Sequence, residues 1–192
     1  KKPLLLFQPF GQGGGKYEVK NTKLGTEYTI ISDPTNRSLP LPFIDKFVEK
    51  FKKDYDIVQI RSPNQYPVKG IGSLFQENGQ PMPLRQIIAL LPYVKGVVAC
   101  DSFLPHAAKL MNTNAIVFWG ATYPENLGYK MHTHYRPTDK FVWLPNRQPH
   151  NNPDAHKINK NVMNYLDTLD LNEIDKIIKK WECCDKICVS KK

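Results

Sequence analysis

The stretch MPLRQIIALLPYVKGVVACDSFLPHAAKLMNTNAIVFWGATYP, residues 82–124, holds the pattern that decides the fold. Its first part, residues 84–94, repeats apolar residues at helical spacing and predicts an amphipathic helix. Continuous apolar runs at 96–100 and 115–119 predict two buried strands, and residues 106–111 predict a short helix between them. A strand, a helix and a second strand in this order predict a right-handed crossover between parallel strands.

The same alternation continues on both sides of this stretch. Residues 43–54 predict a helix, because five apolar residues share one face opposite Lys and Glu. Strands separated by helices of this kind predict an α/β fold, with a Rossmann-like, mostly parallel sheet and helices on both faces. We expect residues 1–150 to form this domain and residues 151–192 to add carboxyl-terminal helices and a tail. Further strands are predicted at 4–7, 56–60 and 141–144, a strand or hairpin arm at 28–32, and helices at 159–171 and 172–181.

Composition narrows the class of protein. The 192 residues carry 27 Lys and Arg against 18 Asp and Glu, a formal charge of +9, and 41% of them are hydrophobic. Clustered apolar residues argue against disorder, and no apolar run reaches the roughly 20 residues that span a bilayer. The lysines are scattered and lack a nucleic-acid-binding motif, so we interpret most of the charge as a solvated face. We therefore expect a soluble, cytoplasmic protein with no nucleic-acid partner and no transmembrane segment.

The two ends of the chain give weaker signals. The first residue is Lys1 rather than Met, and an apolar run follows almost at once, so we expect a piece of a longer protein. Cys183, Cys184 and Cys188 crowd the last ten residues without the paired spacing of a zinc site. We interpret these cysteines as free thiols and expect no metal.

The loop after the predicted strand 96–100 carries the sharpest candidate site. Asp101 and Ser102 stand where the strand turns into a helix, and His106 lies one turn further along. In open parallel sheets, ligands bind beyond the carboxyl ends of strands, and helix amino termini offer N–H groups to anions. Ser102 suits a diphosphate there, Asp101 a sugar hydroxyl and His106 a phosphate oxygen. Ordinary helix capping and a core histidine are the simpler alternative, and these residues alone favour it.

Two further loops supply candidate residues. After the second strand of the opening stretch, Gly120 permits close backbone approach and Thr122 supplies a hydroxyl, although a plain turn explains both. Arg37 stands before the first long predicted helix, where a planar, permanently charged guanidinium suits phosphate pairing. The glycine run 13–15 before Lys16 fits neither the P-loop nor the GxGxxG spacing, so we interpret it as a flexible loop or lid.

Taken in order, these loops resemble the carboxyl-terminal, donor-binding domain of family 9 glycosyltransferases. These are the heptosyltransferase-like enzymes of lipopolysaccharide synthesis, which have the GT-B fold. The family pattern is an apolar strand, D-S/T-G-x-x-H-x-A, a second strand and a Gly-x-Thr-x-Pro loop. The resemblance centres on residues 82–124 and extends over residues 3–145. The matching positions are Asp101, Ser102, His106 and Ala108, followed by Gly120, Thr122 and Pro124.

The resemblance also implies roles for two residues outside these loops. Arg37, three residues before Pro40, falls where the family has a basic residue that contacts the donor diphosphate. Glu77 falls near an acidic residue that binds the donor ribose. The sequence also departs from the family: Phe103 replaces the glycine after Asp-Ser, which removes backbone freedom next to a phosphate. The other departures are Leu39, which replaces a tryptophan, and Pro83 and Arg85, which replace residues of the preceding helix segment.

By this resemblance the chain binds a nucleotide-diphosphate sugar, ADP- or UDP-linked. It would be the donor-binding domain of an inverting, metal-independent hexosyl- or heptosyltransferase that uses no cofactor. The glycan or glycolipid acceptor and the catalytic base would belong to a separate amino-terminal domain, so no catalytic residue is predicted in this chain. A peripheral membrane contact is compatible with such an acceptor. The alternative is a degenerate, non-catalytic carbohydrate- or nucleotide-binding or scaffold module, which Phe103 favours.

Overall fold

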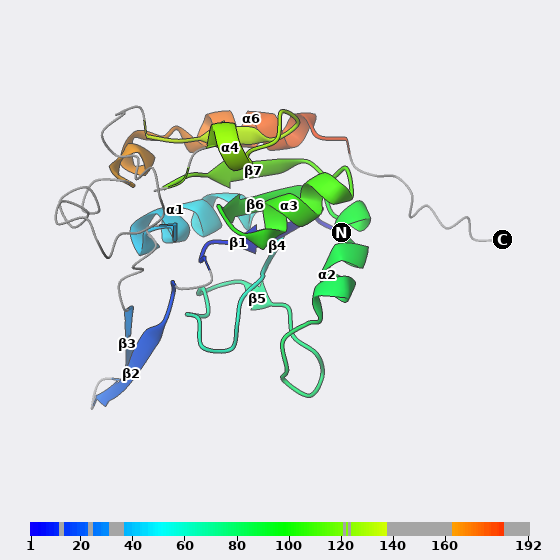
Figure 1. Cartoon of the computed structure of the whole chain (residues 1–192). Helices are drawn as coiled ribbons and strands as arrows, with labels where there is room; N and C mark the ends of the chain where they lie inside the picture. Colours follow the sequence, from blue (N-terminus) through cyan, green and yellow to red (C-terminus); the bar gives the residue numbers. More distant parts are fainter. Residues whose placement is uncertain are drawn as a thin grey trace.

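A parallel six-stranded sheet forms the centre of the molecule (Figure 1). The computed structural model describes residues 1–11, 14–22, 25–30, 37–120, 122, 124–137 and 163–182. The strand order is β5-β4-β1-β6-β7-β8, and every neighbouring pair in it is parallel. The sequence prediction of a Rossmann-like, mostly parallel sheet is thus confirmed. The strands are β1 (Leu4–Gln8), β4 (Asp56–Gln59), β5 (Gly72–Ser73), β6 (Gly96–Cys100), β7 (Ala115–Phe118) and β8 (Thr133–Tyr135).

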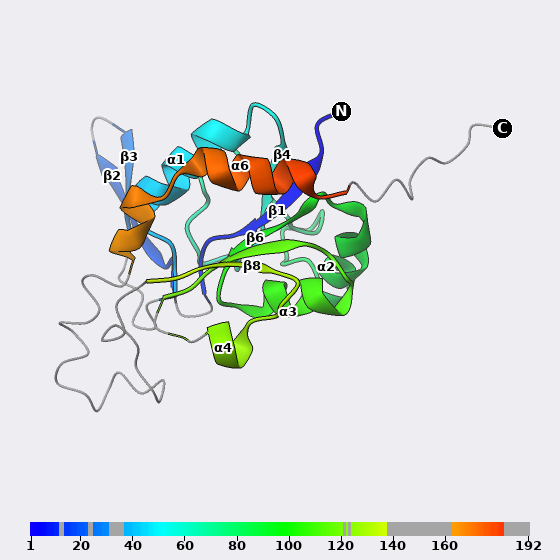
Figure 2. The same cartoon turned by 90° about the horizontal axis from the view of Figure 1, so that it is seen from above.

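Alternate residues of the central strands point to opposite faces of the sheet. In β1, Leu5 and Phe7 belong to one buried cluster and Leu6 belongs to the other. Continuous apolar runs such as LLLF and GVVAC follow from this arrangement, because both faces of these strands are covered. Figure 2 shows α1 and α6 on one side of the sheet and α2 and α3 on the other.

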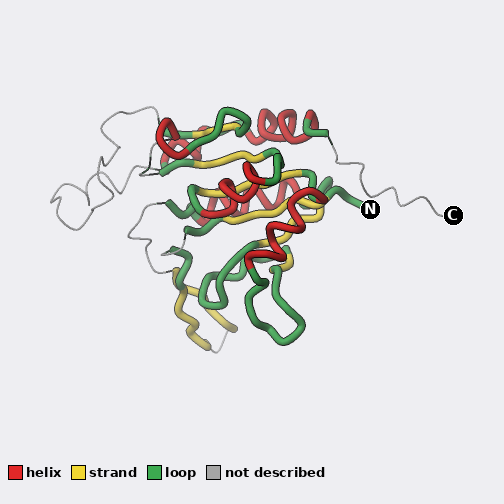
Figure 3. The backbone as a smooth tube through the Cα atoms, turned by 45° about the vertical axis from the view of Figure 1, so that its right-hand side comes forward, coloured by secondary structure: helices red, strands yellow, loops and turns green. Residues whose placement is uncertain are grey.

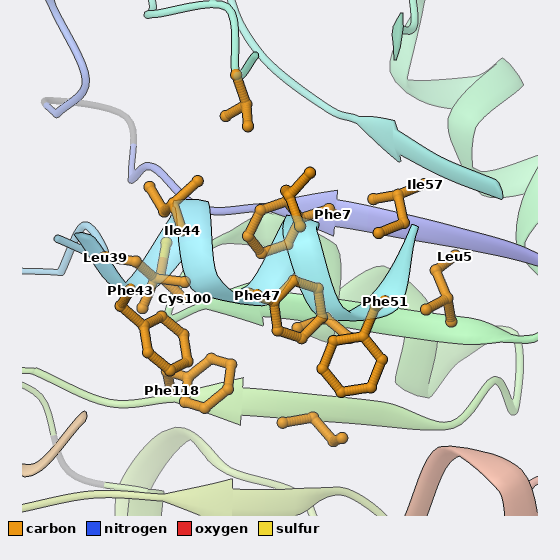
Figure 4. Packing of buried hydrophobic residues seen from close by; sticks show 14 of the residues in the cluster. Leu5, Phe7, Leu39, Phe43, Ile44, Phe47, Phe51, Ile57, Cys100 and Phe118 are labelled. Atoms are coloured by element: carbon orange, nitrogen blue, oxygen red, sulfur yellow. The ribbon is translucent and has the colours of Figure 1, made fainter. Parts of the chain in front are cut away.

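The α1/α6 face is packed with large aromatic rings. Helix α1 (Leu41–Phe51) begins after Pro40, has Pro42 in its first turn, and turns five apolar residues toward the sheet. The Phe47 ring stacks on Phe7 with 4.9 Å between ring centroids, as Figure 4 shows from close by. Helix α6 (Leu171–Lys180) covers the same face with the fully buried Ile174 and Ile178. The helix predicted at 43–54 is therefore confirmed, as is the last predicted helix.

The opposite face is packed with smaller side chains. Helix α2 (Leu84–Leu90) and helix α3 (Phe103–Leu110) lie there, with Ala99, Ala107, Ala108 and Ala115 buried between α3 and the strands. The short helix α4 (Pro124–Leu127) follows β7. The helix predicted over 84–94 is split, because a separate 3-10 turn, η1 (Leu91–Tyr93), begins at the residue before Pro92.

A two-stranded antiparallel hairpin stands apart from the main sheet. It consists of β2 (Tyr17–Thr22) and β3 (Gly25–Ile30), and it projects from the connection between β1 and α1 (Figures 1 and 3). The base of the hairpin is tied to the loop after β4. Gln65 Nε2 donates to the Gly11 and Gly14 carbonyls at 2.7 and 3.0 Å, and the Tyr66 N–H donates to the Gly15 carbonyl at 2.7 Å. Residues 28–30 of the segment predicted at 28–32 belong to a hairpin arm, and residues 31 and 32 lie outside the described residues.

Of three predictions near the carboxyl terminus, one is wrong and two lie outside the described residues. The helix expected over 159–171 is wrong in its described part, which holds only the 3-10 turn η4 (Asn164–Thr168). Asp170 then caps α6 by accepting from the Asn172 N–H, so the chain must leave helical geometry before it. The strand predicted at 141–144 and the cysteines Cys183, Cys184 and Cys188 lie outside the described residues.

The described part of the chain lacks both a membrane-spanning helix and a cluster of metal ligands. None of its helices is long and apolar enough to cross a membrane. The same residues contain no group of three or more His, Cys, Asp or Glu side chains placed to hold a metal ion. Cys100, at the end of β6, is fully buried.

Candidate functional site

A cavity of about 500 Å³ opens at the carboxyl ends of β1, β4 and β6. This is the edge of a parallel sheet where ligands are expected to bind. Its described lining includes two guanidinium groups and one carboxylate, a charge balance that favours an anionic ligand. The polar lining residues are Gln8, Arg37, Arg61, Ser62, Gln65, Asp101, Ser102 and His106. The remaining lining residues are apolar: Phe10, Ile60, Pro81, Met82, Leu84, Ile87 and Phe103.

Four of the seven site residues predicted from the sequence line this cavity. They come from two connections that are far apart in the chain: Arg37 precedes α1, whereas Asp101, Ser102 and His106 follow β6. The crossover topology explains why these two connections lie close together. Strands β1 and β6 are neighbours, and both connections leave the same edge of the sheet.

Asp101 and Thr122 form one buried unit. The Thr122 hydroxyl donates to Asp101 Oδ2 at 2.6 Å, and both residues are almost fully buried. Thr122 is therefore a support behind Asp101 and does not line the cavity. With Oδ2 engaged, the other carboxylate oxygen of Asp101 is left to accept a hydrogen bond on the cavity side.

Ser102 is the residue immediately before α3. Its backbone is extended, and its side chain makes no capping hydrogen bond to the helix. The simpler interpretation of this serine as an ordinary helix cap therefore does not hold. Its hydroxyl is available to a ligand in the cavity.

The amino terminus of α3 offers fewer N–H groups than most helices. The Leu104 N–H donates to Gln8 Oε1 at 3.3 Å, and Pro105 has no N–H. Phe103, at the first helical position, is 36% exposed and forms part of the cavity wall. Side chains must therefore contribute more of any anion binding here than they do at a helix terminus with all its donors available.

His106 lies one turn into α3, and Tyr129 contacts its ring. Its Nδ1 is 2.8 Å from the Tyr129 hydroxyl, and the two rings meet edge to face with centroids 5.6 Å apart. The ring itself lines the cavity. This arrangement differs from a histidine buried in the core, the simpler alternative considered above.

Gly120 and Glu77 lie apart from the cavity lining. Gly120 is buried directly after Trp119. Glu77 is exposed in the turn between β5 and α2, where the Gly79 N–H donates to the Gln76 carbonyl. The structure does not bring Glu77 together with the other predicted residues.

The glycine-rich run contributes close packing at the base of the hairpin. Gly15 has φ of +70°, and a Cβ at this position would meet the Phe10 ring at 2.4 Å. Phe10 in turn lines the cavity. Gly13 lies outside the described residues.

Sequence reasoning missed Arg61, which lines the cavity after β4. Its Nη1 donates to the carbonyls of Ser62, Pro63 and Gln65, and its Nε donates to the Ser73 hydroxyl at 2.9 Å. Burial lowers the pKa of its guanidinium, which stays charged at neutral pH. Arg61 directly follows the predicted strand 56–60, so the rule that ligands bind after strand ends would have found it.

Gln8 and Gln65 were also missed. Gln8 ends β1, and Gln65 is nearly buried in the loop after β4. The position of Gln8 at a strand end was a usable signal. No local pattern marks Gln65, because its importance comes from hydrogen bonds to Gly11 and Gly14, about fifty residues earlier in the chain.

No protein-family model matches the sequence, and no curated protein matches it. Solved structures do match. The E. coli heptosyltransferase WaaC with ADP aligns over 94% of this chain with a TM-score of 0.53 and 13% identity. E. coli ADP-heptose lps heptosyltransferase II aligns over 90% with a TM-score of 0.50 and 14% identity. The iron-containing dodecameric glycosyltransferase TibC of enterotoxigenic E. coli aligns over 94% with a TM-score of 0.55 and 10% identity.

The alignments cover less than half of each of these proteins. The matched shares are 45% of WaaC, 48% of heptosyltransferase II and 47% of TibC. At identities this low, the likeness concerns the path of the backbone and not the side chains. The chain therefore has an α/β, Rossmann-like fold that is similar to part of the heptosyltransferases.

Proposed function

We propose that this chain is the nucleotide-diphosphate-sugar-binding part of a glycosyltransferase that resembles the heptosyltransferases. The observation that carries the proposal is the cavity at the carboxyl edge of the sheet, which gathers Arg37, Ser102 and His106 from separate connections. WaaC, one of the similar structures, was solved with ADP and with ADP-2-deoxy-2-fluoro heptose. These ligands belong to that protein, and they support ADP as the first ligand to test here.

The diphosphate would be bound by side chains. Arg37 would pair with a phosphate, while the Ser102 hydroxyl and a ring N–H of His106 would donate hydrogen bonds. When the bond from the sugar to the diphosphate breaks, negative charge grows on the departing phosphate oxygen. Donors held in place beforehand stabilise that charge, so the proposed transfer does not depend on a metal ion.

The sugar and the nucleotide base of the donor would contact the remaining residues of the cavity. Asp101, supported by Thr122, would accept a hydrogen bond from a sugar hydroxyl. The apolar side chains of Ile60, Met82 and Ile87 would contact the flat face of the nucleotide base. Close backbone approach at Gly120 and ribose binding by Glu77 stay predictions from the family resemblance.

The acceptor side of the reaction would come from elsewhere. In the proposed inverting transfer, an acceptor hydroxyl attacks the anomeric carbon, a base removes its proton, and the nucleoside diphosphate leaves. We place the base and the glycan or glycolipid acceptor on a second domain of a GT-B architecture. The chain spans less than half of each heptosyltransferase named above, which supports this division. We further propose that the enzyme works in the cytoplasm, and that residues 1–150 form the binding domain.

Calorimetry with the full chain tests the proposal. The chain is titrated with ADP, with UDP and with an ADP-linked sugar. Arg37→Ala is expected to weaken binding at least tenfold, because a charge-assisted hydrogen bond contributes roughly 1.5–3 kcal/mol. Arg85→Ala is the matched control, since Arg85 is exposed on α2 and does not line the cavity. Absence of binding to every nucleoside diphosphate would reject the proposal.

A second candidate function is a non-catalytic carbohydrate- or nucleotide-binding or scaffold module. The amino terminus of α3 favours it, because Gln8 engages the Leu104 N–H and Phe103 replaces the glycine of the family. A chain that binds glycans on an array and ignores nucleoside diphosphates in the calorimeter would favour this module over the transferase.

A further inference from the structure

A cluster of aromatic and histidine side chains lies behind the cavity, between α3 and the strands β7 and β8. Its members are Trp119, Tyr129, His132 and His134. None of them lines the cavity. The cluster nevertheless reaches the site, because the Tyr129 hydroxyl is bonded to His106.

His134 is held in one protonation form by its two partners. Trp119 Nε1 is 3.0 Å from His134 Nδ1, and an indole nitrogen can only donate. Nδ1 must therefore accept, and the neutral ring carries its proton on Nε2. That nitrogen is 2.9 Å from the Tyr129 carbonyl and donates to it. Both bonds are satisfied together only by the neutral Nε2–H form of His134.

The backbone of Tyr129 is consequently fixed. Its carbonyl accepts from His134 and also from the His132 N–H at 2.9 Å. Gly128 makes the close approach possible, since a Cβ there would meet the Pro124 carbonyl oxygen at 2.5 Å and His134 Cε1 at 2.9 Å. The Tyr129 ring also packs edge to face against His132, with centroids 5.5 Å apart.

The Tyr129 hydroxyl is the hydrogen-bond partner of Nδ1 of His106. The Tyr129 hydroxyl can donate to Nδ1 or accept from Nδ1–H, and when it donates, the proton of neutral His106 is on Nε2. If His106 is charged, Nδ1–H donates to the phenol oxygen and Nε2 still carries a proton. In both of these states Nε2 is a donor, which suits a phosphate oxygen, whereas a neutral ring with its proton on Nδ1 would present an acceptor to the ligand.

We propose that Tyr129 is a positioning residue for the candidate site: the Trp119–His134–Tyr129 chain of hydrogen bonds holds His106 with a proton on Nε2, ready to donate to an anionic ligand. The proposal rests on the proposed function for the identity of that ligand. It assigns a role to Trp119 and Tyr129 in the connection between β7 and β8, and to His134 in β8, all of which lie outside the cavity lining.

A double-mutant cycle tests the proposal with ADP as the probe. Tyr129→Phe removes only the hydroxyl and is expected to weaken ADP binding three- to tenfold. In a His106→Ala background, the same change is expected to alter binding less than twofold, because nothing is left to position. Equal weakening in both backgrounds would show a merely structural role and overturn the proposal, as would no weakening in the wild-type background.

The matched control is Tyr93→Phe, since Tyr93 is 52% exposed and lies outside the cavity lining. Nitrogen NMR of labelled histidine provides a second readout without any ligand. The wild type is expected to show His106 protonated on Nε2, and Tyr129→Phe to show a mixture of neutral tautomers. If ADP does not bind the wild type, the proposed function fails. The NMR comparison then still tests whether Tyr129 positions His106. A mixture of His106 tautomers already present in the wild type would overturn the positioning role.

Discussion

The two faces of the central sheet are packed with residues of different size. On the α1/α6 face, contacting aromatic rings such as Phe7, Phe47 and Phe51 fill the space between helix and strands. On the α2/α3 face, alanines such as Ala99 and Ala108 let α3 lie close to the sheet, which brings its amino terminus to the cavity. Substitutions on the first face should therefore affect stability, and those near the start of α3 should affect binding.

The largest expected effect is on the aromatic face. Phe47→Ala should lower the free energy of unfolding by about 3–5 kcal/mol, because a fully buried ring with three aromatic neighbours is lost. Denaturant unfolding measures the change. Phe103→Ala, on a partly exposed ring, is the control and should cost less than about 1 kcal/mol. If Phe47→Ala weakened ADP binding by the folded protein as well, the separation between the two faces would fail.

An intermediate effect concerns His132, behind α3. Burial lowers the pKa of its imidazole to about 4, and the nearby positive charge of Lys109 adds to this lowering. Between pH 6.5 and about 4 the unfolded chain binds a proton that the folded form excludes, so stability falls as the pH falls. With solvent screening, we expect a loss of roughly 2 kcal/mol over this window.

Removing the titrating group tests that expectation. His132→Leu should flatten the decline in stability between pH 6.5 and about 4, although it lowers stability at neutral pH through imperfect packing. Urea unfolding at several pH values compares the two proteins. An unchanged slope in the variant would assign the acid sensitivity of this face to other groups.

The smallest expected effect is at the cavity wall. Phe103→Gly restores the glycine that the family resemblance has at this position and lets the backbone approach a phosphate. We expect ADP to bind about threefold more tightly, which corresponds to roughly 0.7 kcal/mol. Phe103→Ala separates ring removal from backbone freedom and should give a smaller gain. Weaker binding in the glycine variant would mean that the ring itself contacts the ligand.

The sequence predicted the parts of the molecule that depend on local pattern. The strand, turn and helix from Gly96 to Leu110 were located because the apolar run, the polar turn and the helix are adjacent in the chain. Strand β8 was missed because it has only three residues, all of them partly exposed, and therefore no apolar run. The break after α2 was missed although Pro92 marks it.

The candidate site was predictable only in part, for the same reason. Residues that follow strand ends, such as Asp101 and Ser102, can be found from the strands alone. The bond between His106 and Tyr129 joins residues 23 positions apart through the folding of β7 and β8. Such pairs depend on tertiary packing, and no spacing rule in a single sequence predicts them.

The side chain of Gln65 connects two parts of the molecule. Its amide holds the Gly11 and Gly14 carbonyls at the base of the β2–β3 hairpin, while the same side chain belongs to the wall of the cavity. The base of the hairpin and the wall of the cavity therefore share one side chain. Substitution of Gln65 would remove both hydrogen bonds, and with them a direct connection between two segments about fifty residues apart in the chain.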